Sequence, residues 1–391
     1  MDKEIFNLIK KEEERQKKQI NLIASENFVS QEILTALGSV LTNKYSEGYA
    51  GKRYYAGNEF IDKIETLCIK RALKLFGLNE NEWSVNVQPY SGSPANLAVY
   101  SALVPLSEKI MGMRLDMGGH LTHGHSVSFT GKAWKQVPYG VSKETEMLDY
   151  NELMEIAKRE KPKLIIAGAS AYSRIIDFEK FREIADACHA YLMADMAHIA
   201  GLIAGGVHPS PFYSKGGKIL ADIVTTTTHK TLRGPRGAMI FSRKELAEKI
   251  DKAVFPSLQG GPHNHQTAAI AVSLKEAMSR DFKKYTAQIL KNAKVFAEEL
   301  KKAGFHIVSG GTDNHLFIVD VWREGKGISG KDAQDRLEKE GIIVSRSTIP
   351  YDTRKPYDPS GIRIGTPAVS TRGFKEKNII KLAKKVIDIL Q

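Results

Sequence analysis

The sequence lacks several features that mark large protein classes. Only 2 of its 391 residues are cysteines, Cys68 and Cys188, and they show neither metal-ligand nor CxxC spacing. No apolar run approaches the roughly 20 residues that span a bilayer. The segment Met1–Phe6 lacks the apolar stretch and cleavage site of a secretory signal. These absences predict a cytoplasmic protein with buried free thiols, no membrane contact and no bound metal.

A concentrated basic patch is also missing, although the chain is basic. It has 57 Lys and Arg against 45 Asp and Glu, which gives a net charge of +12. The basic residues are spread through amphipathic segments such as Lys283–Lys302, without interleaved aromatics. This pattern argues against nucleic-acid binding as the main function. A basic active site that attracts anionic ligands accounts for part of the excess.

Internal repeats and low-complexity linkers are absent too, and short apolar strands alternate with helical patterns from about residue 62 to residue 241. The predicted strands are Ser84–Val87, Leu164–Ala167, Tyr191–Ala194, Ile223–Thr226 and Ala238–Phe241. This alternation predicts an α/β fold, with a mostly parallel sheet between helices. Ligands of such sheets gather beyond the carboxyl ends of the strands.

The two ends of the chain follow other patterns. The first 60 residues lack the alternation and contain a Gly/Tyr-rich stretch, Asn43–Tyr55, and polar residues 8–19 predict a solvated helix. The last third predicts long helices, interrupted near Ser279 and ended by Gly304. After them we expect strands at His306–Val308 and His315–Val321 and a helix at Lys331–Glu340. The predicted parts are an N-terminal helix and arm (1–60), a large α/β domain (61–265), and linking helices with a small α+β domain (266–391).

The most informative stretch runs from Val224 to Gly237. A β-branched strand leads to Lys230, and a Gly/Pro-broken loop with Arg233 and Arg236 follows. Burial and like charge disfavour the ammonium form of a lysine, which activates it to form Schiff bases. Pyridoxal phosphate (PLP) is the cofactor that most often uses such a lysine, and its pyridine nitrogen needs a carboxylate. Asp195, which closes an apolar run 35 residues upstream, is the candidate.

A phosphate site is predicted where Ser91-Gly92-Ser93-Pro94 follows the first strand and opens a helix. Free N–H groups and the positive end of the helix dipole suit a phosphate there. The alternative is a plain turn in which Ser93 caps the helix and Pro94 takes the first helical position.

Two further segments carry candidate ligand-binding side chains. A glycine-rich loop holds His120, His123 and His125, but no carboxylate or cysteine lies nearby at metal-ligand spacing. Arg363 lies in a strand-like segment framed by glycines, where its guanidinium suits bidentate binding of an amino-acid carboxylate. The alternative for Arg363 is a surface position on an edge strand.

Together these stretches resemble the serine hydroxymethyltransferases, which are PLP enzymes of fold type I. The resemblance runs from Asn21 to Pro367 and rests on several long motifs in the same order. It implies a PLP-dependent transferase with a large domain built on a mostly parallel seven-stranded sheet. It also implies reversible transfer of the serine hydroxymethyl group to tetrahydrofolate, which gives glycine and 5,10-methylenetetrahydrofolate, with the cofactor held on Lys230 as an aldimine.

The resemblance assigns roles to individual residues. Those implied for the cofactor are Ser91, Gly92 and Ser93 at the phosphate, Asp195 at the ring nitrogen, His120 on the ring face, Ser170 and His198 around the ring and its oxygen, and Arg236. Those implied for the substrates are Ser25 and Arg363 at the amino-acid carboxylate, and Leu115, Gly119, Leu121 and Ser347 at the folate. Thr227 and His229 flank Lys230 and are expected to steer its exchange with the amino acid.

The resemblance also implies a partner subunit, because the counterpart of Asn43–Tyr55 crosses to the neighbouring active site in the family. There Tyr45 reaches the phosphate, Glu47 reaches the substrate hydroxyl and the folate, and Tyr54 and Tyr55 reach the substrate. Gly260 and Gly261 resemble a segment whose amides reach the neighbour's phosphate. Such shared sites require at least a homodimer, with a tetramer as the alternative.

Three positions depart from the family pattern. Pro94 stands where many members have glutamine, and His125 replaces a serine. Ser347 stands where the family usually has an asparagine that contacts the pterin. This last departure leaves open a folate-independent β-hydroxyamino-acid aldolase, or a hydroxymethyltransferase with another pterin. A basic RNA-binding protein on an enzyme scaffold is a further alternative, against which the intact Asp195, Lys230 and Arg363 argue.

Overall fold

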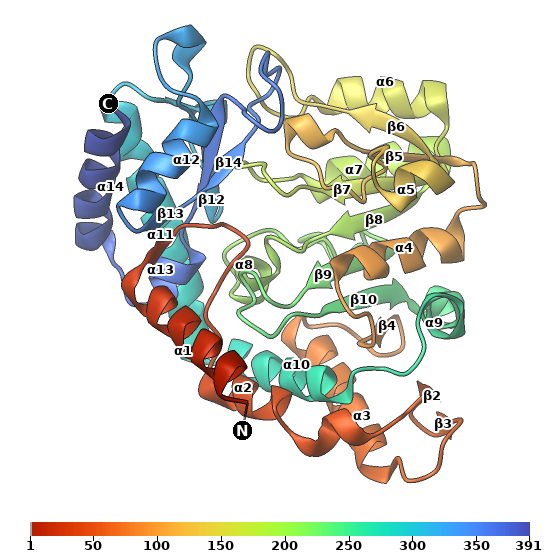
Figure 1. Ribbon diagram of the computed structural model, residues 1–391. Coiled ribbons are helices and arrows are strands. Elements are labelled where there is room, and N and C mark those ends of the chain that lie inside the picture. Colours follow the sequence, from red (N-terminus) through yellow and green to blue (C-terminus); the bar gives the residue numbers. More distant parts are fainter. Residues whose placement is uncertain (1) are drawn as a thin grey trace.

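The computed structural model describes residues 2–391 and contains a large sheet of seven strands (Figure 1). Their order is β4-β10-β9-β8-β7-β5-β6, and only β10 runs antiparallel to its neighbours. The mostly parallel seven-stranded sheet expected from the sequence is therefore confirmed. The strands are β4 (Trp83–Asn86), β5 (Lys109–Met113), β6 (Lys135–Tyr139), β7 (Leu164–Gly168), β8 (Tyr191–Asp195), β9 (Ile223–Thr227) and β10 (Ala238–Arg243).

Helices bury both faces of the large sheet. On strand β7, Leu164 and Ile166 pack on one face and Ile165 and Ala167 on the other, because side chains alternate along a strand. Both sets are apolar, as expected for a parallel sheet covered on both sides. The first face packs against α4 (Gly92–Leu103) and α9 (Ala247–Lys252), and the second against α3 (Glu59–Leu75), α6 (Tyr150–Glu160), α7 (Phe178–Cys188) and α10 (Asn264–Ala277).

A small antiparallel sheet with its own core lies in the C-terminal part of the chain, drawn in blue in Figure 1. Its order is β11-β12-β15-β14, and Phe317 and Ile364 are fully buried in its core. The strands are β11 (His306–Ile307), β12 (Leu316–Asp320), β14 (Ser345–Ser347) and β15 (Gly361–Gly365). The helices are α11 (Arg280–Lys302), α12 (Gly330–Lys339), α13 (Pro367–Thr371) and α14 (Glu376–Leu390).

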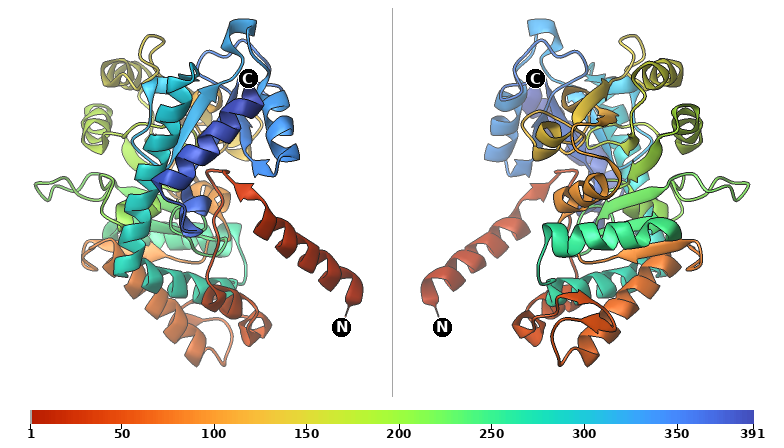
Figure 2. Two further views of the ribbon diagram at one scale, coloured as in Figure 1. Left: turned by 90° about the vertical axis from the view of Figure 1, so that its left-hand side faces the viewer. Right: turned by 90° about the vertical axis from the view of Figure 1, so that its right-hand side faces the viewer.

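The N-terminal segment joins this second core. Strand β1 (Ile20–Asn21) pairs with β13 (Ile342–Ile343), and the fully buried Leu22 follows it. Helix α1 (Lys3–Lys18) precedes them, has no buried residue and projects from the body (Figure 2). The shorter elements are α2 (Gln31–Leu37), β2 (Gly48–Tyr49), β3 (Lys52–Arg53), α5 (Phe129–Ala133) and α8 (Ala200–Ala204). No helix within residues 2–391 is long and apolar enough to cross a membrane.

Strands β5 and β6 were not predicted, and their sequences explain why. β5 reads Lys-Ile-Met-Gly-Met, with a glycine and two methionines where β-branched residues are typical. β6 contains Pro138, which a strand tolerates at the edge of a sheet, where β6 lies. The predicted helix break is confirmed, because Ser279 caps α11 by accepting a hydrogen bond from the Phe282 amide at 3.1 Å.

Truncating Leu22 should destabilise the small core from the N-terminal side. Because Leu22 is fully buried, Leu22→Ala should lower the free energy of unfolding by about 3 kcal/mol. Chemical denaturation followed by circular dichroism measures this, with the exposed Leu106→Ala as a matched control that changes little. A loss below about 1 kcal/mol for Leu22→Ala would contradict the assigned packing.

Candidate active site

Residues from several parts of the chain meet at the carboxyl ends of β7, β8 and β9. They surround a cavity of about 160 Å³, the lysine pocket. Its lining includes most of the side chains that the sequence assigns to a cofactor, so the structure brings these residues together. They are Ser91, Gly92, Ser93, His120, Ser170, Asp195, His198, Thr227, His229, Lys230 and Arg236.

Lys230 follows strand β9 and is largely buried. Its Nζ donates a hydrogen bond to Thr227 Oγ1 at 2.9 Å, and its carbonyl accepts one from Asn27 Nδ2 at 2.9 Å. Burial lowers the pKa of Lys230 to about 8, and the charges of Arg363 and Arg236 add to this, while Asp195 opposes it. The lysine therefore offers a substantial fraction of neutral amine near neutral pH.

The side chain of Arg233 does not lie where the sequence analysis placed it. Its guanidinium carbon lies 4.6 Å from the centre of the Tyr285 ring and 5.6 Å from that of Phe282. This cation–π stacking turns the charge toward α11. The like charge beside Lys230 comes instead from Arg236 and from Arg363 of the small sheet.

Asp195 ends strand β8 and is held by three donors. Its Oδ2 accepts hydrogen bonds from Asn96 Nδ2 and from His123 Nε2, both at 3.0 Å. Its Oδ1 accepts one from the Ala197 amide at 3.1 Å. Burial raises the pKa of Asp195, but the hydrogen bonds from His123 and Asn96 outweigh it, so the pKa lies below its ordinary value. The carboxylate is thus anionic at neutral pH and suited to a protonated ring nitrogen.

His120 lies beside this carboxylate on the loop that follows β5. Its Nδ1 accepts a hydrogen bond from the Thr122 amide at 3.2 Å and lies 2.7 Å from Thr122 Oγ1. Burial lowers the pKa of His120 to about 4, and His123 and Lys230 add to this. A neutral imidazole at this wall of the pocket suits stacking on an aromatic ring.

The phosphate site predicted at Ser91–Ser93 is formed by the first turn of α4. Ser91, rather than Ser93, is the N-cap, and its side chain makes no capping hydrogen bond. The alternative prediction for Ser93 and Pro94 is therefore wrong, because the helix begins at Gly92. A Cβ at Gly92 would lie 2.8 Å from Thr227 Cγ2, so only glycine fits between α4 and β9. Free amide groups at this helix start suit a phosphate.

Arg363 reaches the site from the small sheet. Strand β15 lies between β12 and β14, so the alternative of an exposed edge strand is wrong. Arg363 Nη1 donates to the Ser170 carbonyl at 2.8 Å, and its buried Nε has no partner within residues 2–391. Burial lowers the pKa of Arg363 to about 10. A cation with a buried free donor fits a substrate carboxylate.

A second cavity of about 760 Å³, the outer pocket, lies where the two sheets meet. Arg363 and Ser170 line it, together with Leu115, Gly119 and Ser347, three of the four residues predicted for the folate, and His125. The fourth, Leu121, does not line it, and 43% of its surface is exposed. Ser347 Oγ donates to the neighbouring Thr348 carbonyl at 3.0 Å, so its hydroxyl is already engaged.

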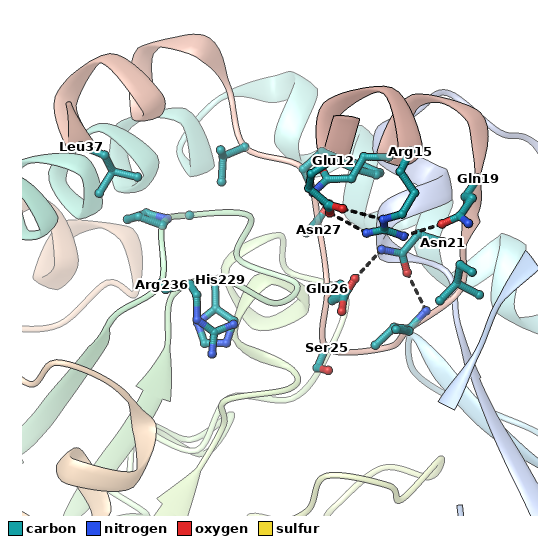
Figure 3. Close-up of a pocket in the computed structure, with 17 residues that line it drawn as sticks. Glu12, Arg15, Gln19, Asn21, Ser25, Glu26, Asn27, Leu37, His229 and Arg236 are labelled. Carbon is teal, nitrogen blue, oxygen red and sulfur yellow. Dashed lines mark hydrogen bonds and ion pairs between the residues drawn. The ribbon is translucent and has the colours of Figure 1, made fainter. Parts of the chain in front are cut away.

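Ser25 lines a third cavity, of about 420 Å³, between α1 and the body (Figure 3). His229 and Arg236 line both this cavity and the lysine pocket. His229 Nδ1 is buried without a partner within residues 2–391, and burial lowers the pKa of His229 to about 3. In Figure 3 two hydrogen-bonded residues of α1, Glu12 and Arg15, lie across the cavity from His229 and Arg236.

The arm, residues 43–55, forms a separate cluster. The Tyr45 and Tyr55 ring centres are 5.1 Å apart, and a Cβ at Gly261 would lie 3.2 Å from the Tyr45 ring. A Cβ at Gly260 would lie 3.3 Å from Glu47 Oε1. Within residues 2–391, no arm residue lines the lysine pocket, and Tyr45, Tyr54 and Tyr55 are exposed. The structure therefore separates the arm residues from the predicted site residues that line the pockets.

Sequence reasoning missed the residues that hold Asp195. Asn96 is 99 residues and His123 is 72 residues away along the chain. The only available signal was position: Asn96 lies one turn into the helix that opens at Gly92, and His123 shares a loop with His120. His315, which contacts His198, was missed as well. No group of three or more metal-ligating side chains occurs in the described chain.

Comparison with known proteins decides the family. The model of the serine hydroxymethyltransferase family matches residues 1–386. A serine hydroxymethyltransferase of Acidothermus cellulolyticus is 55% identical over 388 residues, which cover 99% of this chain and 88% of that protein. One of Desulfotalea psychrophila is 56% identical over 381 residues, 97% of this chain and 87% of that protein. This chain belongs to the serine hydroxymethyltransferase family.

Membership confirms the expected enzyme class. Serine hydroxymethyltransferases are PLP-dependent and use tetrahydrofolate as the co-substrate, as predicted. The residues present fit PLP: a lysine with a lowered pKa, an anionic carboxylate, and free amides at the start of α4. The unpaired Arg363 Nε fits the amino-acid substrate.

The lowered pKa of Lys230 predicts how PLP capture depends on pH. The neutral amine reacts, so capture by the cofactor-free protein should speed up with rising pH, with a midpoint near 8 rather than 10.5. Stopped-flow absorbance after mixing with PLP measures this. In Arg363→Met, which removes one like charge, the midpoint should move upward. A wild-type midpoint near the ordinary value would contradict the burial of Lys230.

Proposed function

We propose that the lysine pocket and the outer pocket together carry out the serine hydroxymethyltransferase reaction, with the residue roles predicted from the sequence. The observation that carries this proposal is the convergence of Lys230, Asp195 and Arg363 from three different strands or loops. Bound PLP supplies a sink for the electrons of the Cα–Cβ bond that breaks in serine. The protein's own groups bind, orient and move protons around it.

Each group of the lysine pocket has one proposed task. Lys230 binds the cofactor aldehyde, and Thr227 orients its Nζ through the 2.9 Å hydrogen bond. Asp195 keeps the ring nitrogen protonated, because its lowered pKa leaves it charged beside that nitrogen. His120 covers a face of the ring, with Ser170 and His198 around the ring and its oxygen. Ser91, Gly92 and Ser93 bind the phosphate at the start of α4.

The substrates take the remaining positions. Arg363, with Ser25, binds the serine carboxylate, for which its buried Nε is the free donor. The outer pocket takes the folate against Leu115, Gly119 and Ser347, and we place Leu121 at its rim. His229, whose buried Nδ1 has no partner within residues 2–391, borders Lys230 together with Arg236. Both residues steer the exchange of Lys230 with serine.

We further propose a homodimer in which each arm completes the neighbouring site. Three observations support it: the arm is absent from the lysine pocket of its own chain, three of its four tyrosines are exposed, and α1 exposes Ile5, Phe6, Leu8 and Ile9. In the dimer Tyr45, Gly260 and Gly261 serve the partner's phosphate and Tyr54 and Tyr55 its substrate. Glu47 moves the proton at the serine hydroxyl oxygen.

Domain boundaries and compartment are proposed on indirect support. The separate cores of the two sheets support a large domain, proposed over 61–265, and a small one within 266–391. Helix α10 and the start of α11 pack on the large core, which suits their proposed place as linking helices. The pairing of β1 with β13 ties part of residues 1–60 to the small domain. Two cysteines without a disulfide, Cys68 and Cys188, support a reducing compartment, which we propose is the cytoplasm.

Labelling tests the role of Lys230. Borohydride reduction of the PLP-loaded enzyme followed by peptide mapping should place the cofactor label on Lys230. Lys230→Ala should take up PLP without covalent labelling and lose multiple turnover. Label on another lysine, with Lys230 unmodified, would contradict the assignment.

Mixing inactive variants tests the shared site. Lys230→Ala and Tyr55→Phe chains, each inactive alone, should recover activity when refolded together, because hybrid dimers contain one site with both residues intact. Random pairing puts about a quarter of all sites in this state. The matched control is the double variant mixed with wild type, whose hybrids contain no intact site. If the subunits exchange fully but no activity is recovered, the shared site would be contradicted.

Ser347 predicts a lower affinity for the pterin ring than an asparagine would give. Its short hydroxyl is engaged by the Thr348 carbonyl, so the amide contact of the family is missing. Ser347→Asn should tighten tetrahydrofolate binding up to about tenfold, the value of one hydrogen bond. Calorimetric titration of the glycine-bound enzyme measures this, with Ser347→Ala as the control. Serine cleavage that never responds to tetrahydrofolate would instead favour the aldolase or another pterin.

A further inference from the structure

Three histidines line a small cavity beside the lysine pocket. His198 lines both the lysine pocket and this cavity, and His208 lines the cavity and an open groove near Tyr213. His315, which is fully buried just before β12, lines the cavity as well. The cavity has a volume of about 10 Å³, roughly the space that one water molecule needs.

The hydrogen bonds of these rings leave one buried nitrogen to be satisfied. His198 Nδ1 lies 3.2 Å from His315 Nε2, so one of these two nitrogens carries the proton they share. His208 Nδ1 lies 2.9 Å from the carbonyl oxygen of Pro209, which only accepts, so this nitrogen is protonated. His315 Nδ1 is buried and has no partner within residues 2–391. Buried polar atoms are satisfied by protein or by water, and the cavity offers space for water.

The two inner rings are neutral. Burial lowers the pKa of His198 well below its ordinary value, and the charges of Lys230 and Arg363 and the rings of His315 and His120 act in the same direction. Burial lowers the pKa of His315 to about 3, and Arg363, His208 and Lys230 add to this. Proton positions on these rings are therefore a matter of tautomers rather than of charge.

The outer ring is neutral as well. Burial lowers the pKa of His208, although the carbonyl of Pro209 and the charge of Asp313 oppose this. Because its single proton is on Nδ1, its Nε2 acts as an acceptor.

We propose that His208, one water and His315 fix the tautomer of His198, so that His198 Nε2 donates a hydrogen bond into the lysine pocket. A water that donates to His208 Nε2 and to His315 Nδ1 leaves the proton of His315 on Nε2. This proton is then donated to His198 Nδ1. Neutral His198 must therefore carry its own proton on Nε2, the ring nitrogen left for a ligand. The Pro209 carbonyl fixes His208, and the proposed water passes this direction on to His315 by donating both of its protons.

This inference rests on the proposed place of His198 beside the ring oxygen of PLP. A fixed donor there favours the anionic form of that oxygen, whereas the other tautomer would present a lone pair to it and repel it. His315 and His208 touch neither cofactor nor substrate in this arrangement. They are positioning residues that act through His198, as second-layer partners orient metal-bound histidines.

Nuclear magnetic resonance of the PLP-loaded enzyme with ¹⁵N-labelled histidine reads the tautomers directly. Long-range proton–nitrogen spectra, assigned with single histidine variants, should show the proton on Nε2 in His198 and His315 and on Nδ1 in His208. A proton on Nδ1 of His198 overturns the proposal. An enzyme that takes up no PLP would instead refute the proposed function, so the two failures are distinguishable.

A pair of similar-sized variants tests the link to the cofactor. In His315→Gln the amide can still donate to His198 Nδ1, whereas His315→Met fills a similar volume without a donor. PLP affinity, measured by fluorescence titration, should stay close to wild type in the Gln variant and fall about tenfold in the Met variant. Thermal unfolding checks that both variants fold. Equal affinities in the two folded variants overturn the proposal.

Discussion

The site depends on one carboxylate that remains charged in a nearly dry place. The side chain of Asp195 is only 10% exposed, and an unpaired charge in such surroundings is costly. Donors from α4, from the loop after β5 and from the turn after β8 hold it as an anion. Because these donors come from three separate elements that pack on the large sheet, they reach the carboxylate only when those elements are packed together. Its negative charge partly offsets the positive charge around Lys230, and in the proposed function it keeps the cofactor ring nitrogen protonated.

The second constraint is that the small sheet must face the large one. Arg363 is held at the centre of β15, and its guanidinium reaches the Ser170 carbonyl beyond β7. The same junction forms the outer pocket, so the proposed sites for the amino acid and the folate share one contact between two cores. His315 reaches across this junction as well and contacts His198, which lies in the turn after β8. In the proposed function, cofactor and substrate binding therefore both depend on how the two sheets are placed.

Much of this architecture could be predicted, because it is encoded locally. The apolar run that ends at Asp195 and the β-branched run before Lys230 predicted β8 and β9 and the edge at which ligands bind. The side-chain partners of Asp195 could not be predicted, since they lie 72 and 99 residues away and only the packed fold brings them close. Arg233 shows the same limit, because its stacking on Tyr285 of α11 depends on tertiary packing. Strand β5 was not predicted, because methionine and glycine do not favour strands as β-branched residues do.

The most direct test of the central role of Asp195 is the protonation of the cofactor ring. ¹⁵N resonance of enzyme loaded with PLP that is ¹⁵N-labelled at the pyridine nitrogen reports whether that nitrogen carries a proton. A charged Asp195 predicts a protonated nitrogen at neutral pH in the wild type and an unprotonated one in Asp195→Asn, which has similar shape but no charge. An unprotonated nitrogen in the wild-type enzyme, or the same signal in both proteins, would contradict this account.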